Sequence, residues 1–310
     1  MLRGSALALV LASAAALGAD RPKVVIVKSA ELSPYAALAA GFSVEVRGQV
    51  EQLTLDESAE GAARTFKQVA ERKPALVLAI GPAAAVGAHR ALTDVPIIFA
   101  MVPYFEKYEL EGPHITGIAL TSDLSLELAA VKALLPEVKR VGVVEDPRFS
   151  QKLIDGASGL AAGQGLSLVP LEIDGPARLE KVLKGAKGKV DALVMISDRT
   201  VGNAAVVERL IAWSTEEKVP AIGLAPGQVK EGALLALAPA PTGLGLQAGR
   251  LANRILHEKV DPGALAVAPP EGVDLHCNLK TARALVDPRK FALDLVTFAA
   301  SKGLAVKVTE

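Results

Sequence analysis

The chain has 310 residues, of which 51% are hydrophobic, so it can form two domains of ordinary size or one large domain. Aromatic residues make up only 4%, and this aliphatic bias suits helices packed on buried parallel strands better than an aromatic-lined β-sandwich. The 34 basic side chains balance the 34 acidic ones, so no basic excess points to nucleic acid, and we expect no nucleic-acid partner.

The N-terminus predicts a secretory signal peptide over residues 1–19. Arg3 supplies a positive charge, residues 6–17 are apolar, and the small residues Ala16, Gly18 and Ala19 permit cleavage after Gly18 or Ala19. The apolar run is shorter than the ~20 residues of a membrane span, although an uncleaved anchor stays open. We therefore expect a periplasmic protein.

Short apolar runs alternate with amphipathic helical stretches along the rest of the chain. The expected strands or extended segments cover residues 23–27, 44–55, 75–80, 95–100, 140–144, 166–171, 192–196, 221–224 and 233–238. The expected helices cover residues 57–72, 84–92, 124–134, 150–162, 177–186, 201–217 and 244–257. Such alternation predicts the α/β class, with parallel sheets built from right-handed βαβ units. Residues 74–99 and 191–223 repeat one strand–helix–strand pattern, which predicts two similar lobes with a ligand between the carboxyl ends of their strands.

No catalytic motif stands out, so we expect a protein that is not an enzyme and that uses no cofactor and no metal. The four histidines are scattered, and the neighbours His276 and Cys277 would point to opposite faces of a strand. A glycine pattern within residues 243–249 is one residue too long for the dinucleotide-binding fingerprint. We favour a helix capped by Thr242, with the glycines serving close packing.

Polar side chains gather after the strand that ends at Ile196. Ser197, Asp198, Thr200 and Asn203 stand at the start of the following helix. There they can bind a polar ligand or cap the helix, and both roles stay open. If Asp198 binds the ligand, Asp198→Ala should weaken binding while leaving the melting temperature nearly unchanged.

Apolar and glycine-rich loops follow the strands of the first half. The loop at Gly81 and Pro82 offers backbone donors without a polar side chain. Met101, Tyr104 and Phe105 follow the next strand, where they form either an apolar wall of the site or an ordinary packed loop.

Nine short motifs occur in a characteristic order along the chain. They are KPALVLAIG (73–81), VPIIFAMV (95–102), ITGI (115–118), LLPEVKRVGV (134–143), VDAL (190–193), VPAIG (219–223), VKEGAL (229–234), GLQAG (245–249) and NLKTA (278–282). With these motifs in this order, the chain resembles the family of bacterial ABC-transporter substrate-binding proteins that includes tryptophan- and tyrosine-type binding components. The resemblance runs from about residue 24 to residue 285, nearly the whole chain after the leader.

The resemblance implies two Rossmann-like lobes of the periplasmic-binding-protein type I-like fold, with several crossovers between them. Lobe 1 would comprise residues 20–118 and 243–286, lobe 2 residues 119–242, and residues 287–310 a C-terminal extension. It also implies an extracytoplasmic component of an ABC importer that captures a small-molecule ligand by hinge closure and presents it to an ABC permease in the inner membrane. We expect the protein to be a monomer.

The resemblance further implies that loops at the carboxyl ends of the strands contact the ligand. The candidate ligand-binding residues are therefore Gly81, Pro82, Met101, Tyr104, Phe105, Asp146, Ser197, Asp198, Thr200, Asn203 and Ala225. Pro82 and residues 225–227 replace hydroxyl or acidic residues that many members carry, which argues against an amino-acid ligand and leaves the ligand unidentified.

Two alternatives of the same fold stay open. One is a transport-inactive sensory or scaffolding protein. The other, a cytoplasmic sugar-responsive regulator, would need a DNA-binding headpiece where the leader stands. Within the extension, residues 291–298 form either a docking helix or an added strand.

Overall fold

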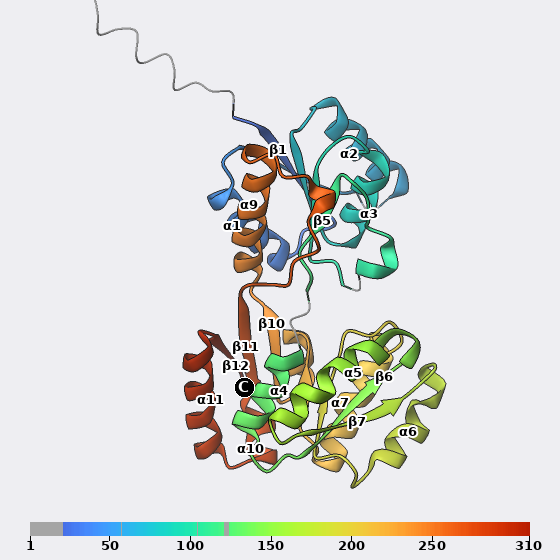
Figure 1. Cartoon of the computed structure of the whole chain (residues 1–310), viewed down its shortest axis with the longest axis vertical. Coiled ribbons are helices and arrows are strands. Elements are labelled where there is room, and N and C mark those ends of the chain that lie inside the picture. Colours follow the sequence, from blue (N-terminus) through green and yellow to red (C-terminus); the bar gives the residue numbers. More distant parts are fainter. Residues whose placement is uncertain (1–20, 57, 104, 121–123) are drawn as a thin grey trace, which may run out of the picture.

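The chain folds into two α/β lobes, one above the other in Figure 1. The structure is a computed structural model and describes residues 21–56, 58–103, 105–120 and 124–310. The predicted signal peptide and Tyr104 therefore lie outside the described residues. In the part of the chain that the structure describes, no helix is long and apolar enough to cross a membrane.

Lobe 1 is built on a five-stranded parallel sheet with the order β2-β1-β3-β4-β5. Its strands are β1 (Lys23–Lys28), β2 (Gln49–Thr54), β3 (Leu76–Ile80), β4 (Ile97–Ala100) and β5 (Ile115–Gly117). Side chains alternate between the two faces of a strand, and here both faces are buried. Val24 and Ile26 of β1 join one hydrophobic cluster, whereas Val25 and Val27 join another.

Helices cover both faces of this sheet. Helices α1 (Ser33–Glu45) and α9 (Pro241–His257) pack on the first cluster, and α2 (Ala59–Glu71), α3 (Pro82–Ala91) and the short η2 (Phe105–Tyr108) pack on the second. The C-terminal half of the chain thus contributes α9 to the first lobe, where it lies beside α1 (Figure 1).

Glycines allow α1 and α9 to approach each other closely. A Cβ atom on Gly245 would lie 2.1 Å from the Leu38 carbonyl oxygen, and one on Gly41 would lie 2.3 Å from the Thr242 carbonyl oxygen. The glycine pattern therefore serves helix packing. The expected cap is wrong, because α9 begins at Pro241 with Ala240 at the cap position and no side-chain hydrogen bond there. Proline fits the first turn of a helix, because a backbone N–H at that position would have no intrahelical partner in any residue.

Lobe 2 is built on a seven-stranded sheet with the order β12-β11-β10-β9-β8-β6-β7. Its strands are β6 (Arg140–Glu145), β7 (Ser167–Glu172), β8 (Ala192–Val194), β9 (Ala221–Gly223), β10 (Leu235–Pro239), β11 (Val273–Asn278) and β12 (Ala305–Thr309). Neighbouring strands run parallel except β10 and β11. Two sheets dominated by parallel strands confirm the predicted fold class.

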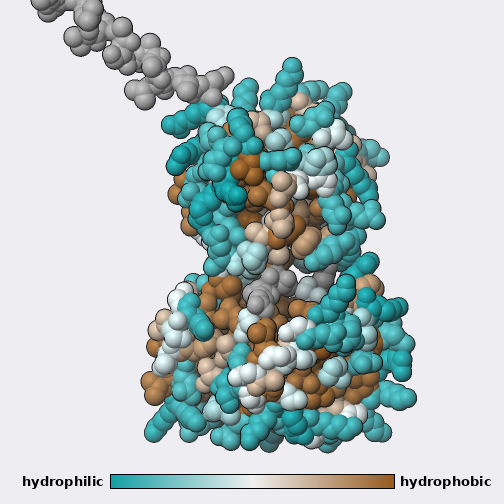
Figure 2. Space-filling model, viewed as in Figure 1, coloured by the Kyte–Doolittle hydropathy of each residue, from teal (hydrophilic) through white to brown (hydrophobic). Residues whose placement is uncertain are grey.

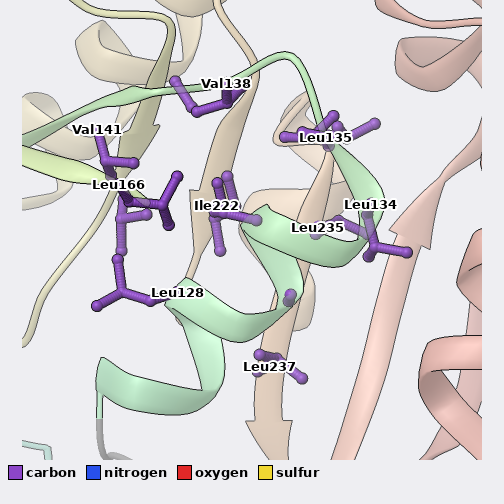
Figure 3. Close-up of a cluster of buried hydrophobic side chains, with 14 of the residues drawn as sticks. Leu128, Leu134, Leu135, Val138, Val141, Leu166, Ile222, Leu235 and Leu237 are labelled. Carbon is purple, nitrogen blue, oxygen red and sulfur yellow. The ribbon is translucent and has the colours of Figure 1, made fainter. Parts of the chain in front are cut away.

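Helices also cover both faces of the second sheet. One face carries α4 (Leu124–Leu134), α5 (Pro147–Gly163), α10 (Leu279–Leu285) and α11 (Pro288–Lys302). The other carries α6 (Leu179–Ala186), which the short η3 (Pro176–Arg178) directly precedes, and α7 (Ala204–Glu217). Figure 3 shows part of the lobe 2 cluster on the α4 face of the sheet, where leucines of α4 contact Ile222 of β9 and Leu235 of β10. No hydrophobic cluster of the described residues spans both lobes, so each lobe has its own core.

Three expected boundaries differ from the structure. Residues 273–286, assigned to lobe 1, lie in lobe 2, because β11 pairs antiparallel with β10. Residues 287–310 are part of lobe 2 as well: residues 291–298 lie within α11, and β12 adds an edge strand beside β11. Residues 44–55 are not wholly extended, because α1, an alanine-rich helix with no strong apolar periodicity, runs to Glu45 before β2 starts.

The chain passes between the lobes at three segments. It leaves lobe 1 after β5, returns after β10, and leaves again after the short η4 (Pro262–Ala264) to enter β11. The Ala240 N–H donates to the Gly272 carbonyl oxygen (3.0 Å), so two of these segments lie side by side. Figure 2 shows the molecule narrowing to a waist between the lobes.

Candidate functional site

The topology turns the carboxyl ends of both parallel sheets toward the opposite lobe. In lobe 1, the edge strand β5 runs parallel to β4 and ends at the first crossing. In lobe 2, β8, β9 and β10 run parallel and β10 ends at the second crossing. Loops and helix N-termini of open α/β sheets converge at such edges, which is where these folds bind ligands. We call these two surfaces the lobe 1 face and the lobe 2 face.

Gly81 shapes the lobe 1 face. It has φ of +90°, a conformation that a side chain disfavours, and it precedes Pro82 at the start of α3. A Cβ atom on Gly81 would lie 2.5 Å from the Tyr35 hydroxyl and 2.7 Å from the Ser29 hydroxyl. Ser29 Oγ accepts a hydrogen bond from the Ala84 N–H (2.9 Å). Burial raises the pKa of Tyr35, so its hydroxyl stays protonated and uncharged. This face therefore offers neutral hydroxyl groups.

Met101 and Phe105 lie in different packing environments. Met101 has φ of 57° and packs against the cluster that contains α1 and α9. Phe105 packs against Phe99 with ring centroids 5.4 Å apart, in the cluster on the other face of the sheet. The structure thus does not bring these two side chains together into one apolar wall, and the packed-loop interpretation accounts for both.

Asp146 is the centre of a polar network on the lobe 2 face. It caps α5, is buried, and accepts hydrogen bonds from Arg148 Nε (2.8 Å) and Thr200 Oγ1 (2.6 Å). The guanidinium of Arg148 lowers the pKa of Asp146 well below its usual range, so this carboxylate is ionised. The loop after β6 is thereby joined to the loop after β8.

Asp198 joins the same two loops from the other side. Its carboxylate accepts hydrogen bonds from the backbone N–H groups of Asp146 (3.0 Å), Thr200 (2.8 Å) and Val201 (3.1 Å), and from the Ser150 hydroxyl. The residue is 1% exposed. The carboxylate is therefore fully engaged inside the protein, and the expectation that its removal leaves the melting temperature unchanged does not fit this geometry.

The remaining predicted residues lie at the same edge in less connected positions. Asn203 is exposed and caps α7 through the Ala205 N–H (2.9 Å). Ser197 is half-buried near the beginning of the loop after β8. Ala225 is the cap residue directly before α8 (Pro226–Glu231). Its N–H donates to Gln228 Oε1 (3.3 Å), which closes that loop without a polar side chain at positions 225–227.

Three residues outside the candidate ligand-binding residues, Arg148, Phe149 and Arg199, complete the lobe 2 face; the sequence already places the Arg199 guanidinium in the polar loop after β8. Phe149 is 48% exposed, and the guanidinium groups of Arg148 and Arg199 lie 5.5 and 4.9 Å from its ring centroid. A large aromatic residue shortly after a helix cap is a sequence signal of a functional residue. Its contact with Arg199, however, depends on two loops about 50 positions apart in the sequence.

Glu145 is a buried carboxyl group beside this network. Both of its oxygens are buried and lack a hydrogen-bond partner among the described residues. Burial, and then the nearby Glu172 and Asp198, raise its pKa. Among the described residues, no group of three or more His, Cys, Asp or Glu side chains is placed to hold a metal ion.

Comparison with known proteins identifies relatives over most of the chain. The profile of a family described as ABC transporter substrate binding protein matches residues 45–286. A tyrosine-binding protein of Clostridioides difficile strain R20291 is 27% identical over 242 residues, which is 75% of this chain and 68% of that protein.

Two solved structures share the fold. The ligand-free, open structure of a Clostridium difficile substrate binding protein with adhesive properties has a TM-score of 0.70 at 20% identity, covering 93% of this chain and 100% of that one. An ABC domain from Streptococcus pneumonia in complex with L-Trp has a TM-score of 0.59 at 18% identity, covering 92% of this chain and 100% of that one.

Proposed function

The chain belongs to the ABC transporter substrate binding protein family, and from this premise we propose that it captures a small solute between its two lobes for an ABC importer. The observation that carries the proposal is the orientation of the sheets. Two lobes with separate cores turn the carboxyl ends of their strands toward each other and are joined by three segments. A solute that contacts both faces would favour a closed arrangement by hinge motion at these segments.

The two faces offer complementary chemistry for a small solute. The lobe 1 face presents the hydroxyl groups of Ser29 and Tyr35 around Gly81. The lobe 2 face presents the network of Asp146 and Thr200 with the exposed arginines and Phe149 beside it. Small-molecule sites of this kind combine a few convergent polar groups with apolar surface. The aromatic amino acids named for two relatives support a solute of that size.

The transport role completes the proposal. We propose that the N-terminal leader directs the protein to the periplasm, where it acts as a monomer, hands its solute to an inner-membrane permease, and performs no chemistry on it. The polar network supports binding without catalysis, because Asp146 and Asp198 are engaged by neighbouring groups and not free to act as a base on a bound solute.

A thermal-shift screen tests this function. The protein from residue 20 onward would be heated with single amino acids, short peptides, purines, sugars and organic acids, each over a range of concentrations. A bound solute stabilises the folded state by RT ln(1 + [L]/Kd), about 2.7 kcal/mol at a concentration of 100 Kd. We expect saturable stabilisation by one chemical class. No response to any class would favour the sensory or scaffolding alternative.

A further inference from the structure

Arg199 is the cation of the lobe 2 face whose hydrogen-bond donors are not used. It is exposed, and within the described residues it makes no ion pair or hydrogen bond through its side chain; its contact is with the Phe149 ring. The neighbouring Arg148 differs, because its guanidinium binds the Asp146 carboxylate and donates to the Asp174 carbonyl oxygen (2.9 Å). The two arginines of this face are therefore not equivalent.

The Phe149 ring presents Arg199 in a usable geometry. A guanidinium stacked on an aromatic face is attracted by the ring and keeps its N–H donors, which lie in its own plane. The centroid distance of 4.9 Å falls within the range of such contacts. A planar fork of N–H donors matches the two oxygens of a carboxylate. Phe149 thus acts as a positioning residue for Arg199.

The acidic groups near Arg199 do not compete for it. Asp146 is held by Arg148 and Thr200, and Asp198 is held by three backbone N–H groups and Ser150. The opposite lobe adds neutral hydroxyl groups at Ser29 and Tyr35. Of the charged side chains of this network, Arg199 is therefore the one whose hydrogen-bond donors remain for a small solute. Glu145, the carboxyl group beside this network that lacks a hydrogen-bond partner, is buried, and its pKa is raised, which favours the uncharged form.

We propose that Arg199 is a ligand-binding residue and that the solute carries a carboxylate group, which Arg199 binds in bidentate fashion while Phe149 orients the guanidinium. The proposal rests on the proposed solute-binding function and narrows it to organic acids, with or without an amino group. The carboxylate, and not an ammonium group, is the feature that the protein requires.

Isothermal titration with three matched probes tests the proposal. L-tyrosine carries both groups, 3-(4-hydroxyphenyl)propionate lacks the ammonium, and tyramine lacks the carboxylate. Each is titrated into the wild-type protein, Arg199→Gln, Arg199→Lys and the control Arg289→Gln. Arg289 is an exposed arginine at the start of α11, at the opposite edge of the seven-stranded sheet. We expect both acids to bind and tyramine to bind at least tenfold more weakly. Arg199→Gln should lose at least tenfold in affinity for the acids, Arg199→Lys less, and Arg289→Gln nothing.

The other outcomes distinguish a failure of the carboxylate proposal from a failure of the proposed solute-binding function. Wild-type affinity in Arg199→Gln, or equal binding of tyramine and the acids, overturns the carboxylate proposal and leaves solute binding intact. The same holds if the thermal-shift screen finds a solute without an anionic group. Failure of all three probes, together with no response to any organic acid in the screen, also overturns the carboxylate proposal. No response to any class in that screen contradicts both.

The role of Phe149 has its own readout. Phe149→Ala should weaken binding of both acids several-fold while leaving the unfolding temperature nearly unchanged, because the ring is 48% exposed. Phe149→Trp keeps an aromatic face and should restore most of the affinity. Equal affinity in Phe149→Ala and the wild type would show that the ring does not position Arg199. Loss in both variants would show that the phenyl ring itself, and not an aromatic face in general, is required.

Discussion

Replacing Asp198 with alanine should destabilise the seven-stranded lobe whether or not a solute is present. The carboxylate satisfies four donors, and three of these bonds are buried: those from the Asp146 N–H, the Ser150 hydroxyl and the Val201 N–H. Leaving a buried donor unpaired costs about 1–3 kcal/mol, and because water can enter the space that the side chain leaves, we expect about 3–5 kcal/mol in total. At about 2–4 °C per kcal/mol, the unfolding temperature should fall by roughly 6–20 °C.

Urea and thermal unfolding of the protein without solute provide the assay. Asn203→Ala serves as the control, because it removes one exposed cap bond at the same edge and should cost only ~1 kcal/mol. Asp198→Asn should fall between the two variants, since one amide oxygen can still accept from Thr200 and Val201 while the Asp146 N–H loses its acceptor. An unfolding temperature for Asp198→Ala within about 2 °C of the wild type would refute this reasoning.

Three further substitutions test the packing and the charges. Gly245→Ala should destabilise lobe 1 by about 1–3 kcal/mol, because the added Cβ would lie 2.1 Å from the Leu38 carbonyl oxygen. Gly159→Ala on exposed α5, where a Cβ meets nothing within 4 Å, should instead stabilise by about 0.5–1 kcal/mol; equal effects in urea unfolding would contradict the close approach of α1 and α9. Because the pKa of Glu145 is raised, the wild-type protein should lose stability as the pH rises through that folded-state value, and Glu145→Gln should remove this loss. A difference in unfolding free energy between the two that stays constant from pH 4 to pH 8 would contradict it. Arg140 holds the pKa of Asp191 at about 2 instead of 3.8, so the stability from this ionised pair should disappear as the pH falls through about 2; Asp191→Asn should cost stability at pH 7 and little near pH 2. A cost that does not change with pH would show that the charge is irrelevant.

Local patterns in the sequence predicted most of the fold. Helix α4 has the bounds expected for it, and the apolar runs of β1, β3 and β6 lie within one or two residues of their expected positions. Each of these segments carries its own periodicity. The helix α1 was missed because its alanine and glycine side chains give no apolar stripe, and it is stable through its contact with α9, about 200 residues away. The pairing of β11 with β10 across the intervening α9 likewise has no local signal.

The candidate site was predicted by location more than by role. The loop after β8 does hold Asp198 and Thr200 at a carboxyl edge, as the strand–helix alternation implies. What Asp198 binds is decided by the loop after β6, which lies about 50 residues earlier in the chain. The contact between Phe149 and Arg199 depends on the same pairing. Tertiary contacts of this kind determine which polar groups remain free for a solute, and a single sequence does not encode them in any local pattern.

Measuring the separation of the two lobes with and without solute tests solute capture between the lobes. Spin labels at Lys67→Cys on α2 and Lys152→Cys on α5 place one probe on an exposed helix of each lobe. Cys277 should stay unlabelled, because it is buried and burial raises the pKa of its thiol to about 11. If the lobes close on the solute, a saturating solute from the screen shortens the distance between the labels and narrows its distribution. Saturating binding with an unchanged distance distribution would contradict capture between the lobes by hinge closure.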